Sequence, residues 1–297
     1  MAEHPDGALD LSRDRVSRAA VWRLRDATLR FGRSPLLMGI VNVTPDSFSD
    51  GGRFVETSAA VDHALGLVAA GAAIVDVGGE STRPGAAPVD ADAELRRVMP
   101  VVERLCRETE VAVSIDTSKA RVAREAVAAG AQAINDVTAL TGDARMVQVA
   151  VETGAGVCAM HMLGSPGSMQ DDPRYDDVVA EVREYLAARR DALTAAGVER
   201  ERICLDPGIG FGKTTEHNLR LLSRVETFHA LGCPVLVGPS RKAFIGRVFG
   251  DGDGDRTAGT LGVVLAMALA GVQIVRVHDV AAAKQALTLF EAVRTNM

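Results

Sequence analysis

Features that would define several classes of protein are scarce or missing in this sequence. It contains only four cysteines, and no two of them form a CxxC pair. Three of the four lie in or beside apolar, strand-like segments, where a cysteine is usually a small buried hydrophobic residue. The four are Cys106, Cys158, Cys204 and Cys233. A disulfide framework is therefore not indicated, and we expect a protein of the reducing cytoplasm.

An excess of positive charge is also missing. The chain has 33 Lys and Arg against 39 Asp and Glu, which gives a formal net charge of -6. This balance argues against general nucleic-acid binding, although it allows a local basic pocket for a small anion. Residues 1–20 lack the apolar core of a signal peptide. The longest apolar segment starts at Ala258, contains glycines and divides into a predicted helix and strand, so we expect no membrane segment.

What the sequence does contain is a repeated alternation of apolar and amphipathic segments. Each apolar segment is continuously hydrophobic, as expected for a strand that is buried on both faces of a parallel sheet. The eight predicted strands are residues 35–43, 72–79, 111–117, 131–137, 156–162, 202–208, 233–240 and 272–280. The segments between them have helical spacing, and several end at a glycine, which is frequent at helix C-termini. These glycines are Gly71, Gly130, Gly154, Gly197 and Gly232.

Eight strand–helix units without a linker predict an α/β fold, a closed (β/α)8 TIM barrel rather than an open doubly wound sheet. We expect a barrel domain over residues 20–297 and a flexible N-terminal extension over residues 1–19. The segment "VWRLRDATLRF" (21–31) alternates with a period of two on either side of a polar turn. It predicts a short hairpin at the bottom of the barrel.

Polar residues gather at the predicted carboxyl ends of the strands. In this architecture the active site forms at that end of the barrel. A barrel without a site would have no reason to concentrate charge on one rim, so we interpret this rim as a catalytic or binding site. Its polar residues are Asn42, Asp76, Glu80, Asp116, Asn135, Asp136, His161, Asp206, Ser240, Arg241, Lys242, Arg276, His278 and Asp279.

The acidic part of this rim suits a flat heterocycle that is rich in N–H donors. Asp116 and Asp206 can each accept a pair of N–H groups, and the amide of Asn135 can pair with a mixed donor and acceptor edge. The alternative interpretation is a structural hydrogen-bond network between strand ends and loops.

The basic part of the rim suits phosphate or carboxylate. It consists of Arg83, Arg241, Lys242, Arg276 and His278. Arg276 and His278 are two residues apart on a predicted strand, so we expect them on the same face. The alternative interpretation is salt bridges to carboxylates in the loops.

The chain resembles the dihydropteroate synthase family of pterin-binding enzymes. The resemblance runs in order over residues 20–297. It includes two signature segments, "LMGIVNVTPDSFSDGG" (37–52) and "GAAIVDVGGESTRPGA" (71–86). Shorter matches are "SIDTSK" (114–119), "INDV" (134–137), "MHM" (160–162), "LDPGIGFGK" (205–213), "SRK" (240–242) and "RVHDV" (276–280). The chain departs from the usual pattern at Leu163, Gly167 and Pro239.

The resemblance implies a transferase of folate biosynthesis that is the target of sulfonamides and is usually a homodimer. Such an enzyme joins 7,8-dihydropterin-CH2-pyrophosphate to p-aminobenzoate and releases pyrophosphate with Mg²⁺. The residues implied for the pterin are Asp116, Asn135, Asp206, Phe211, Gly238 and Lys242. Those implied for p-aminobenzoate are Phe48, Thr82, Pro84 and Ser240.

The resemblance also implies residues for the anion and for the chemistry. Pyrophosphate would contact Asn42, Thr82, Arg83, Arg276 and His278, and Asn42 would also bind the metal. The implied catalytic residues are Asp50, Arg83, Lys242, Arg276 and His278. Phe48 and Asp50 lie in "NVTPDSFSDGG", an unusually polar loop with a single aromatic residue, and the resemblance explains this composition as a lid over the site.

Two other functions are compatible with parts of the pattern. A methyltransferase domain that binds methyl-tetrahydrofolate in a related barrel would share the acidic residues, but it should lack the pyrophosphate pair and the "TPDSFSDGG" segment. A non-catalytic paralogue that binds pterin or supports another protein usually loses lid or phosphate residues, and this chain keeps them.

Overall fold

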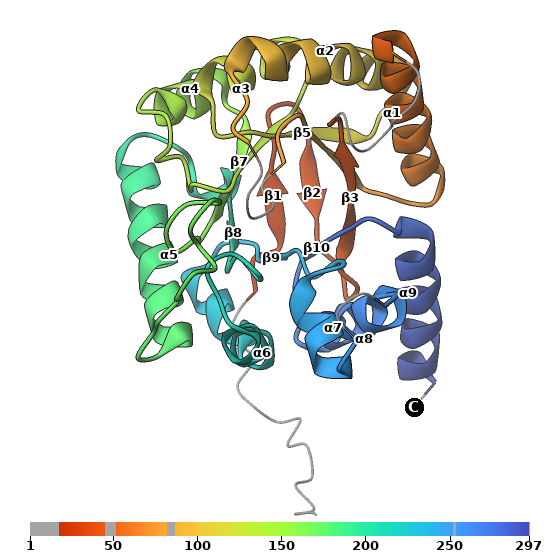
Figure 1. Cartoon of the computed structure of the whole chain (residues 1–297), viewed down its shortest axis with the longest axis vertical. Coiled ribbons are helices and arrows are strands. Elements are labelled where there is room, and N and C mark those ends of the chain that lie inside the picture. The colour runs from red at the N-terminus through yellow and green to blue at the C-terminus, as the bar shows by residue number, and fades with distance from the viewer. Residues whose placement is uncertain (1–17, 45–51, 82–86, 252–253, 297) are drawn as a thin grey trace, which may run out of the picture.

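The computed structural model describes residues 18–44, 52–81, 87–251 and 254–296, and it describes no side chain for residues 52–56. Phe48, Asp50, Thr82, Arg83 and Pro84 therefore lie outside the described residues. Within them, helices form a ring around a set of parallel strands (Figure 1). The predicted TIM barrel is confirmed.

The barrel consists of eight parallel strands in the order β8-β7-β6-β5-β4-β3-β10-β9. They are β3 (Leu36–Asn42), β4 (Ile74–Gly78), β5 (Ala112–Asp116), β6 (Ala133–Asp136), β7 (Gly156–Met160), β8 (Ile203–Asp206), β9 (Leu236–Val237) and β10 (Ile274–Val277). A parallel bridge between Leu205 and Val235 joins the two outer strands of this order. The bridge closes the sheet into a barrel, so it has no free edge at this level.

Amphipathic helices cover the outer face of the strands. They are α1 (Gly52–Ala69), α2 (Ala91–Glu108), α3 (Ala120–Ala128), α4 (Met146–Thr153), α5 (Val178–Ala195), α6 (Thr215–Ser223), α7 (Ala243–Phe249), α8 (Thr257–Leu269) and α9 (Val280–Thr295), with 3-10 turns η2 (Arg200–Arg202) and η3 (Val225–Leu231). All five glycines predicted at helix ends have a positive φ, a conformation that glycine adopts without steric cost. The apolar segment from Ala258 divides into α8 and β10, as predicted.

The predicted hairpin is also present and fills the bottom of the barrel. Strands β1 (Val21–Arg23) and β2 (Thr28–Arg30) pair antiparallel, with Trp22 opposite Leu29. The fully buried Trp22 packs against the first inward-facing residues of the barrel strands, and its Nε1 donates to the Arg202 carbonyl at 2.9 Å. The hairpin thus excludes water from the end of the barrel opposite the strand ends that carry polar residues.

Strand alternation separates the barrel interior into an apolar and a polar layer. The inner layer next to the hairpin is apolar and contains Met38, Ile74, Ala112, Ala133, Cys158, Cys204, Leu236 and Ile274. Residues two positions further along a strand face the same side. In several strands these residues are polar, namely Asp76, Ser114, Asn135, Asp206 and Arg276. The core between strands and helices is separate and almost entirely aliphatic.

Candidate active site at the mouth of the barrel

Arg276 is the centre of a hydrogen-bonded network at the polar ends of the strands. Its Nε donates to Asp76 Oδ2 at 2.7 Å, and its Nη2 donates to Asp116 Oδ2 at 2.7 Å. Asn135 Nδ2 donates to the same Asp76 oxygen at 2.9 Å. Asp76 is fully buried, and its Oδ1 has no hydrogen-bond partner among the residues that the structure describes. Arg276, Asp76, Asp116 and Asn135 therefore form one network across four strands.

The charges in this network change each other's protonation. Burial raises the pKa of Asp116 to about 7; Arg276 opposes this effect and the nearby Asp76 carboxylate adds to it. Burial disfavours the charged form of Arg276, but Asp76 and Asp116 together raise the pKa of its guanidinium. Near neutral pH, Arg276 is therefore a fixed cation, whereas the raised pKa of Asp116 makes this carboxyl group easier to protonate than an ordinary aspartate.

Asp206 lies on the other side of the mouth, at the end of β8. Burial raises its pKa to about 6, opposed by the Gly208 N–H, which donates to Oδ1 at 2.7 Å, and by Lys242. Gly208 has φ 69°, and a side chain at this position would overlap the His161 carbonyl. Glycine is therefore required for the tight turn that brings this N–H to the carboxylate.

Lys242 lies near both acids and contacts an aromatic ring. Its Nζ lies 4.0 Å from the centre of the Phe211 ring, a cation–π contact. Burial lowers the pKa of Lys242 to about 8, and the Arg276 charge adds to this effect. Asp206 and Asp116 act in the opposite direction. Phe211 and Lys242 provide a flat face next to hydrogen-bond acceptors, which suits a planar ring.

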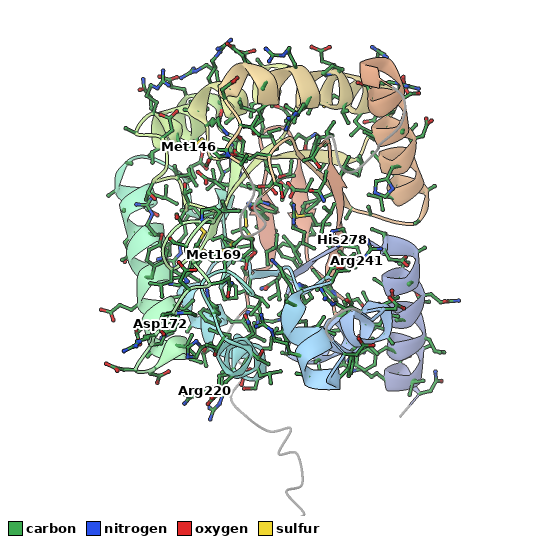
Figure 2. All side chains as sticks on the ribbon, in the orientation of Figure 1. Met146, Met169, Asp172, Arg220, Arg241 and His278 are labelled. Carbon is green, nitrogen blue, oxygen red and sulfur yellow. The ribbon has the colours of Figure 1, made fainter. Side chains whose placement is uncertain are left out.

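A second polar pair joins the ends of β9 and β10. Ser240 Oγ lies 3.0 Å from His278 Nδ1, and the His278 backbone N–H donates to the same oxygen at 3.2 Å. Figure 2 labels His278 and Arg241 over the part of the barrel that α7, α8 and α9 surround. His278 lies one residue beyond the last residue of β10, Val277, so it is not part of the strand as predicted, and its shared face with Arg276 stays a prediction. Strand alternation ends before His278.

A buried lysine supports the loop that carries Phe211. Lys213 Nζ lies 2.9 Å from His161 Nδ1 and donates to the Phe211 carbonyl at 2.9 Å. Burial lowers the pKa of Lys213 to about 7 and the pKa of His161 to about 3. His161 is therefore neutral and can accept the hydrogen bond. This contact joins the connections that follow β7 and β8.

Asn42 is the implied metal ligand. It ends β3 beside Gly78 of β4 and is half-buried. Among the residues that the structure describes, no group of three or more His, Cys, Asp or Glu could hold a metal ion. A protein site with one oxygen ligand fits Mg²⁺ only where phosphate and water supply the other ligands, which is the usual way Mg²⁺ binds beside phosphorylated substrates.

The structure places every described site residue at the same end of the barrel, and it adds two that sequence reasoning missed. Asp76 was noted as a strand-end residue but was given no role, although it contacts both Arg276 and Asn135. The period of two from Ile74 indicates its inward direction, but its partners are distant in sequence. Lys213 was given no role of its own in the matched segment "LDPGIGFGK", and its contacts become visible only because the structure buries it against His161 and Phe211.

Comparison with known proteins agrees with the fold and identifies the family. The family model described as "Pterin binding enzyme" matches residues 38–278. An Escherichia coli protein named dihydropteroate synthase is 48% identical over 258 residues, which is 87% of this chain and 91% of that protein. A Xanthomonas albilineans dihydropteroate synthase with 4-aminobenzoic acid has a TM-score of 0.86 and 46% identity, over 93% of this chain and 98% of the other.

A further solved structure is the Xanthomonas albilineans enzyme in complex with 7,8-dihydropteroate. It has a TM-score of 0.82 and 44% identity, and the match covers 92% of this chain and 98% of the other. The barrel and its mouth thus define a pterin-binding enzyme. Within that class, the chain belongs to the dihydropteroate synthase family.

Proposed function

We propose that this protein is a transferase of folate biosynthesis that condenses 7,8-dihydropterin-CH2-pyrophosphate with p-aminobenzoate to form 7,8-dihydropteroate and pyrophosphate. The observation that carries the proposal is the convergence of Asp116, Asn135 and Asp206 on one mouth that Lys242 and Phe211 cover. These acceptors match the N–H donors along one edge of a pterin.

Pterin recognition rests on the two carboxylates and the amide. Asn135 uses its Nδ2 on Asp76, so its Oδ1 is oriented as an acceptor. Asp116 uses one oxygen on Arg276, which leaves the other for a ligand. Phe211, Gly238 and Lys242 would contact the ring faces and edges. Because the pocket is largely buried, a charged acceptor there strengthens each hydrogen bond and discriminates against rings without matching donors.

Pyrophosphate and p-aminobenzoate would occupy the outer part of the mouth. His278, Arg276 and Asn42 would hold pyrophosphate, and Ser240 would contact the p-aminobenzoate carboxylate. The remaining implied residues lie outside the described parts of the chain: Phe48, Thr82 and Pro84 at the acceptor, Thr82 and Arg83 at pyrophosphate, and Asp50 and Arg83 in catalysis. The Ser240–His278 contact supports a link between the two subsites.

The chemistry exchanges one bond at the pterin methylene carbon. The C–O bond to pyrophosphate breaks, the oxygen keeps the electron pair, and the aryl amine forms the C–N bond and then loses a proton. Positive charge on the methylene group would be stabilised by Asp50 and by the buried acids around the ring, and Arg276 and His278 would stabilise the departing anion. Lys242 would keep the ring oriented, and no covalent enzyme intermediate is required.

Mg²⁺ is proposed as the metal, held by Asn42 together with pyrophosphate. When bound, it would neutralise charge on the leaving group. Asn42 suits this role because its amide oxygen is a hard ligand, and no side-chain hydrogen bond of Asn42 is found within the described residues.

A homodimer is proposed through α7, α8 and α9. These neighbouring helices expose large apolar side chains, among them Val248, Phe249, Leu269 and Leu289. Gly259 of α8 faces Ile245 and Phe249 of α7, where a side chain would not fit. Such a patch is typical of a protein interface. None of the described helices is long and apolar enough to cross a membrane, and we propose a cytoplasmic location.

The experiment is an assay of pyrophosphate release by purified protein with Mg²⁺. Release should require both the pterin pyrophosphate and p-aminobenzoate, and mass spectrometry should identify dihydropteroate. The matched control is the Asp206→Asn variant. Release without p-aminobenzoate, or none with both substrates, would contradict the proposed function.

A further inference from the structure

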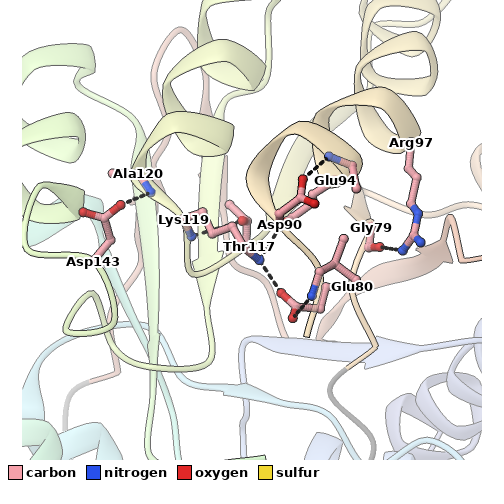
Figure 3. A network of polar contacts seen from close by, with 11 residues as sticks. Gly79, Glu80, Asp90, Glu94, Arg97, Thr117, Lys119, Ala120 and Asp143 are labelled. Atoms are coloured by element: carbon pink, nitrogen blue, oxygen red, sulfur yellow. Dashed lines mark hydrogen bonds and ion pairs between the residues drawn. The ribbon is translucent and has the colours of Figure 1, made fainter. Parts of the chain in front are cut away.

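Glu80, Glu94 and Lys119 form a cluster of charged residues where β4 and β5 lead into α2 and α3. None of the three is among the residues implied to contact a substrate. Lys119 Nζ forms ion pairs with Glu80 and with Glu94, the latter at 2.6 Å (Figure 3). The Glu94 side chain is fully buried, and within the described parts of the chain its second oxygen has no hydrogen-bond partner. Burial lowers the pKa of Lys119, but Glu80 and Glu94 outweigh it and the net shift is upward. Two carboxylates thus share one ammonium, and removing it would leave a buried charge without a partner.

Glu80 joins the two ends of the connection between β4 and α2. One of its carboxylate oxygens pairs with Lys119, and the other accepts the N–H of Val89 at 3.0 Å. Glu80 and Val89, the described residues that flank residues 81–88 in the sequence, are therefore joined by one carboxylate. Asp90 follows at once as the N-cap of α2, where its Oδ1 accepts from the Ala93 N–H at 2.7 Å.

Gly79, the residue after β4, allows α2 to pack close to the Glu80 carboxylate. A side chain at Gly79 would lie 2.7 Å from Val98 Cγ1 and 3.0 Å from Glu94 Cγ, so α2 packs directly on the Gly79 backbone. Arg97 Nη1 also donates to the Gly79 carbonyl at 2.7 Å. This close approach places Glu94 beside Lys119, which is the N-cap residue of α3.

We propose that the cluster of Glu80, Lys119 and Glu94 is a positioning device that fixes both ends of the β4–α2 connection and thereby sets the affinity for p-aminobenzoate. The proposal rests on the proposed function, because Thr82, Arg83 and Pro84 belong to this connection. None of the three charged residues needs to touch a substrate. Their contribution is to hold Glu80 and Val89, the described residues on either side of the connection, in one arrangement before the acceptor binds.

The test compares variants of Glu80 by steady-state kinetics and by calorimetry. Glu80→Ala removes both contacts, whereas Glu80→Gln keeps an acceptor for the Val89 N–H. KM for p-aminobenzoate, at saturating pterin pyrophosphate, should rise about tenfold in Glu80→Ala and less in Glu80→Gln. The Kd of a pterin analogue, measured without p-aminobenzoate, should change less than about twofold.

Arg121→Met is the matched control. Arg121 of α3 pairs with Asp92 of α2 at 2.6 Å, so it joins the same two helices on their exposed side without contacting the connection. Its KM for p-aminobenzoate should equal that of the parent. Glu80→Ala and Arg121→Met should both lower the thermal stability of the protein. If KM for p-aminobenzoate rises only in the Glu80 variants, the result supports a positioning role for the cluster.

Three results would overturn the inference. They are an unchanged KM in Glu80→Ala, an equal loss of pterin and p-aminobenzoate affinity, or the same KM increase in Arg121→Met. A parent protein that releases no pyrophosphate would overturn the proposed function, and this inference with it. An active parent with unaffected Glu80 variants would overturn this inference alone.

Discussion

Arg276 and Asp76 form a buried ion pair, with Nε of the arginine 2.7 Å from Oδ2 of the aspartate. The pair is 200 residues apart in the chain and joins β10 to β4. Asp76 thereby fixes the direction of the guanidinium, whose Nη2 reaches Asp116. Asp76 thus orients Arg276, whereas Asp116 is the residue proposed to bind the pterin.

The first prediction concerns Asp76→Asn. The Asp76 charge contributes to the raised pKa of Asp116, so its removal should lower that pKa toward the ordinary value of an aspartate. The acid limb of the pH profile for pterin-analogue binding should move to lower pH. Calorimetric titrations between pH 5 and 8 measure this shift. A profile identical to that of the parent would show that Asp76 does not act on Asp116.

The second prediction concerns the two proposed pterin acids. Asp116→Asn and Asp206→Asn should each weaken binding of a pterin analogue by about 2–3 kcal/mol, because a charged acceptor facing buried N–H donors is lost. The exposed Asp191, which pairs with Arg190 on α5, offers the control variant Asp191→Asn. Unchanged affinity in both pocket variants would remove these residues from the pocket.

The third prediction separates binding from stability. Burial raises the pKa of Asp116 to about 7 and that of Asp206 to about 6. Their contribution to stability is therefore fully present below the ordinary aspartate pKa of about 4 and is lost as the pH rises through about 6 to 7. The free energy of unfolding of the parent should fall over this window, and the fall should be smaller in the double Asn variant.

Guanidinium titrations of the parent and the double variant at pH 5 and pH 8 measure this difference. The variant should bind pterin worse and yet lose less stability between the two pH values. If the free energy of unfolding falls equally in both proteins, ionising these carboxyl groups does not destabilise the folded state.

The sequence predicted the barrel, because its eight apolar segments and the glycines after the helices are local signals. The strand ends also identified the polar rim, since period-two alternation and the carboxyl-end rule need no knowledge of contacts. The hairpin was predicted by the same alternation, and Trp22 confirms its place at the bottom of the barrel. These features follow from short-range patterns.

The contacts within the rim could not be predicted in this way. That Asp76 binds Arg276, or that Lys213 lies buried against His161, depends on strands and loops that are far apart in the chain. The sequence also does not show that β10 stops at Val277, one residue before His278. A flat ring for Asp116, Asn135 and Asp206 was inferred from the residue types at the strand ends, whereas the roles of Lys242 and Ser240 came from the family resemblance. All of these roles remain proposals.

The fourth prediction concerns Ser240 and the order in which the substrates bind. In Ser240→Ala, His278 loses the hydroxyl partner of both its ring and its backbone N–H, so one substitution should affect two subsites. We expect a higher KM for p-aminobenzoate and weaker binding of pyrophosphate with Mg²⁺.

In the parent, p-aminobenzoate should bind poorly alone and more tightly once pyrophosphate and Mg²⁺ are present. Calorimetry of p-aminobenzoate with and without both measures this, and strong binding to the protein alone would contradict the predicted order.

The central claim is tested most directly by pyrophosphate release under four conditions: no substrate, each substrate alone, and both together, always with Mg²⁺. The account predicts release only with both substrates, in a one-to-one ratio to dihydropteroate, and loss of that release in Asp116→Asn. Pyrophosphate released in equal amount with the pterin substrate alone, or substrate binding without any release, would contradict it.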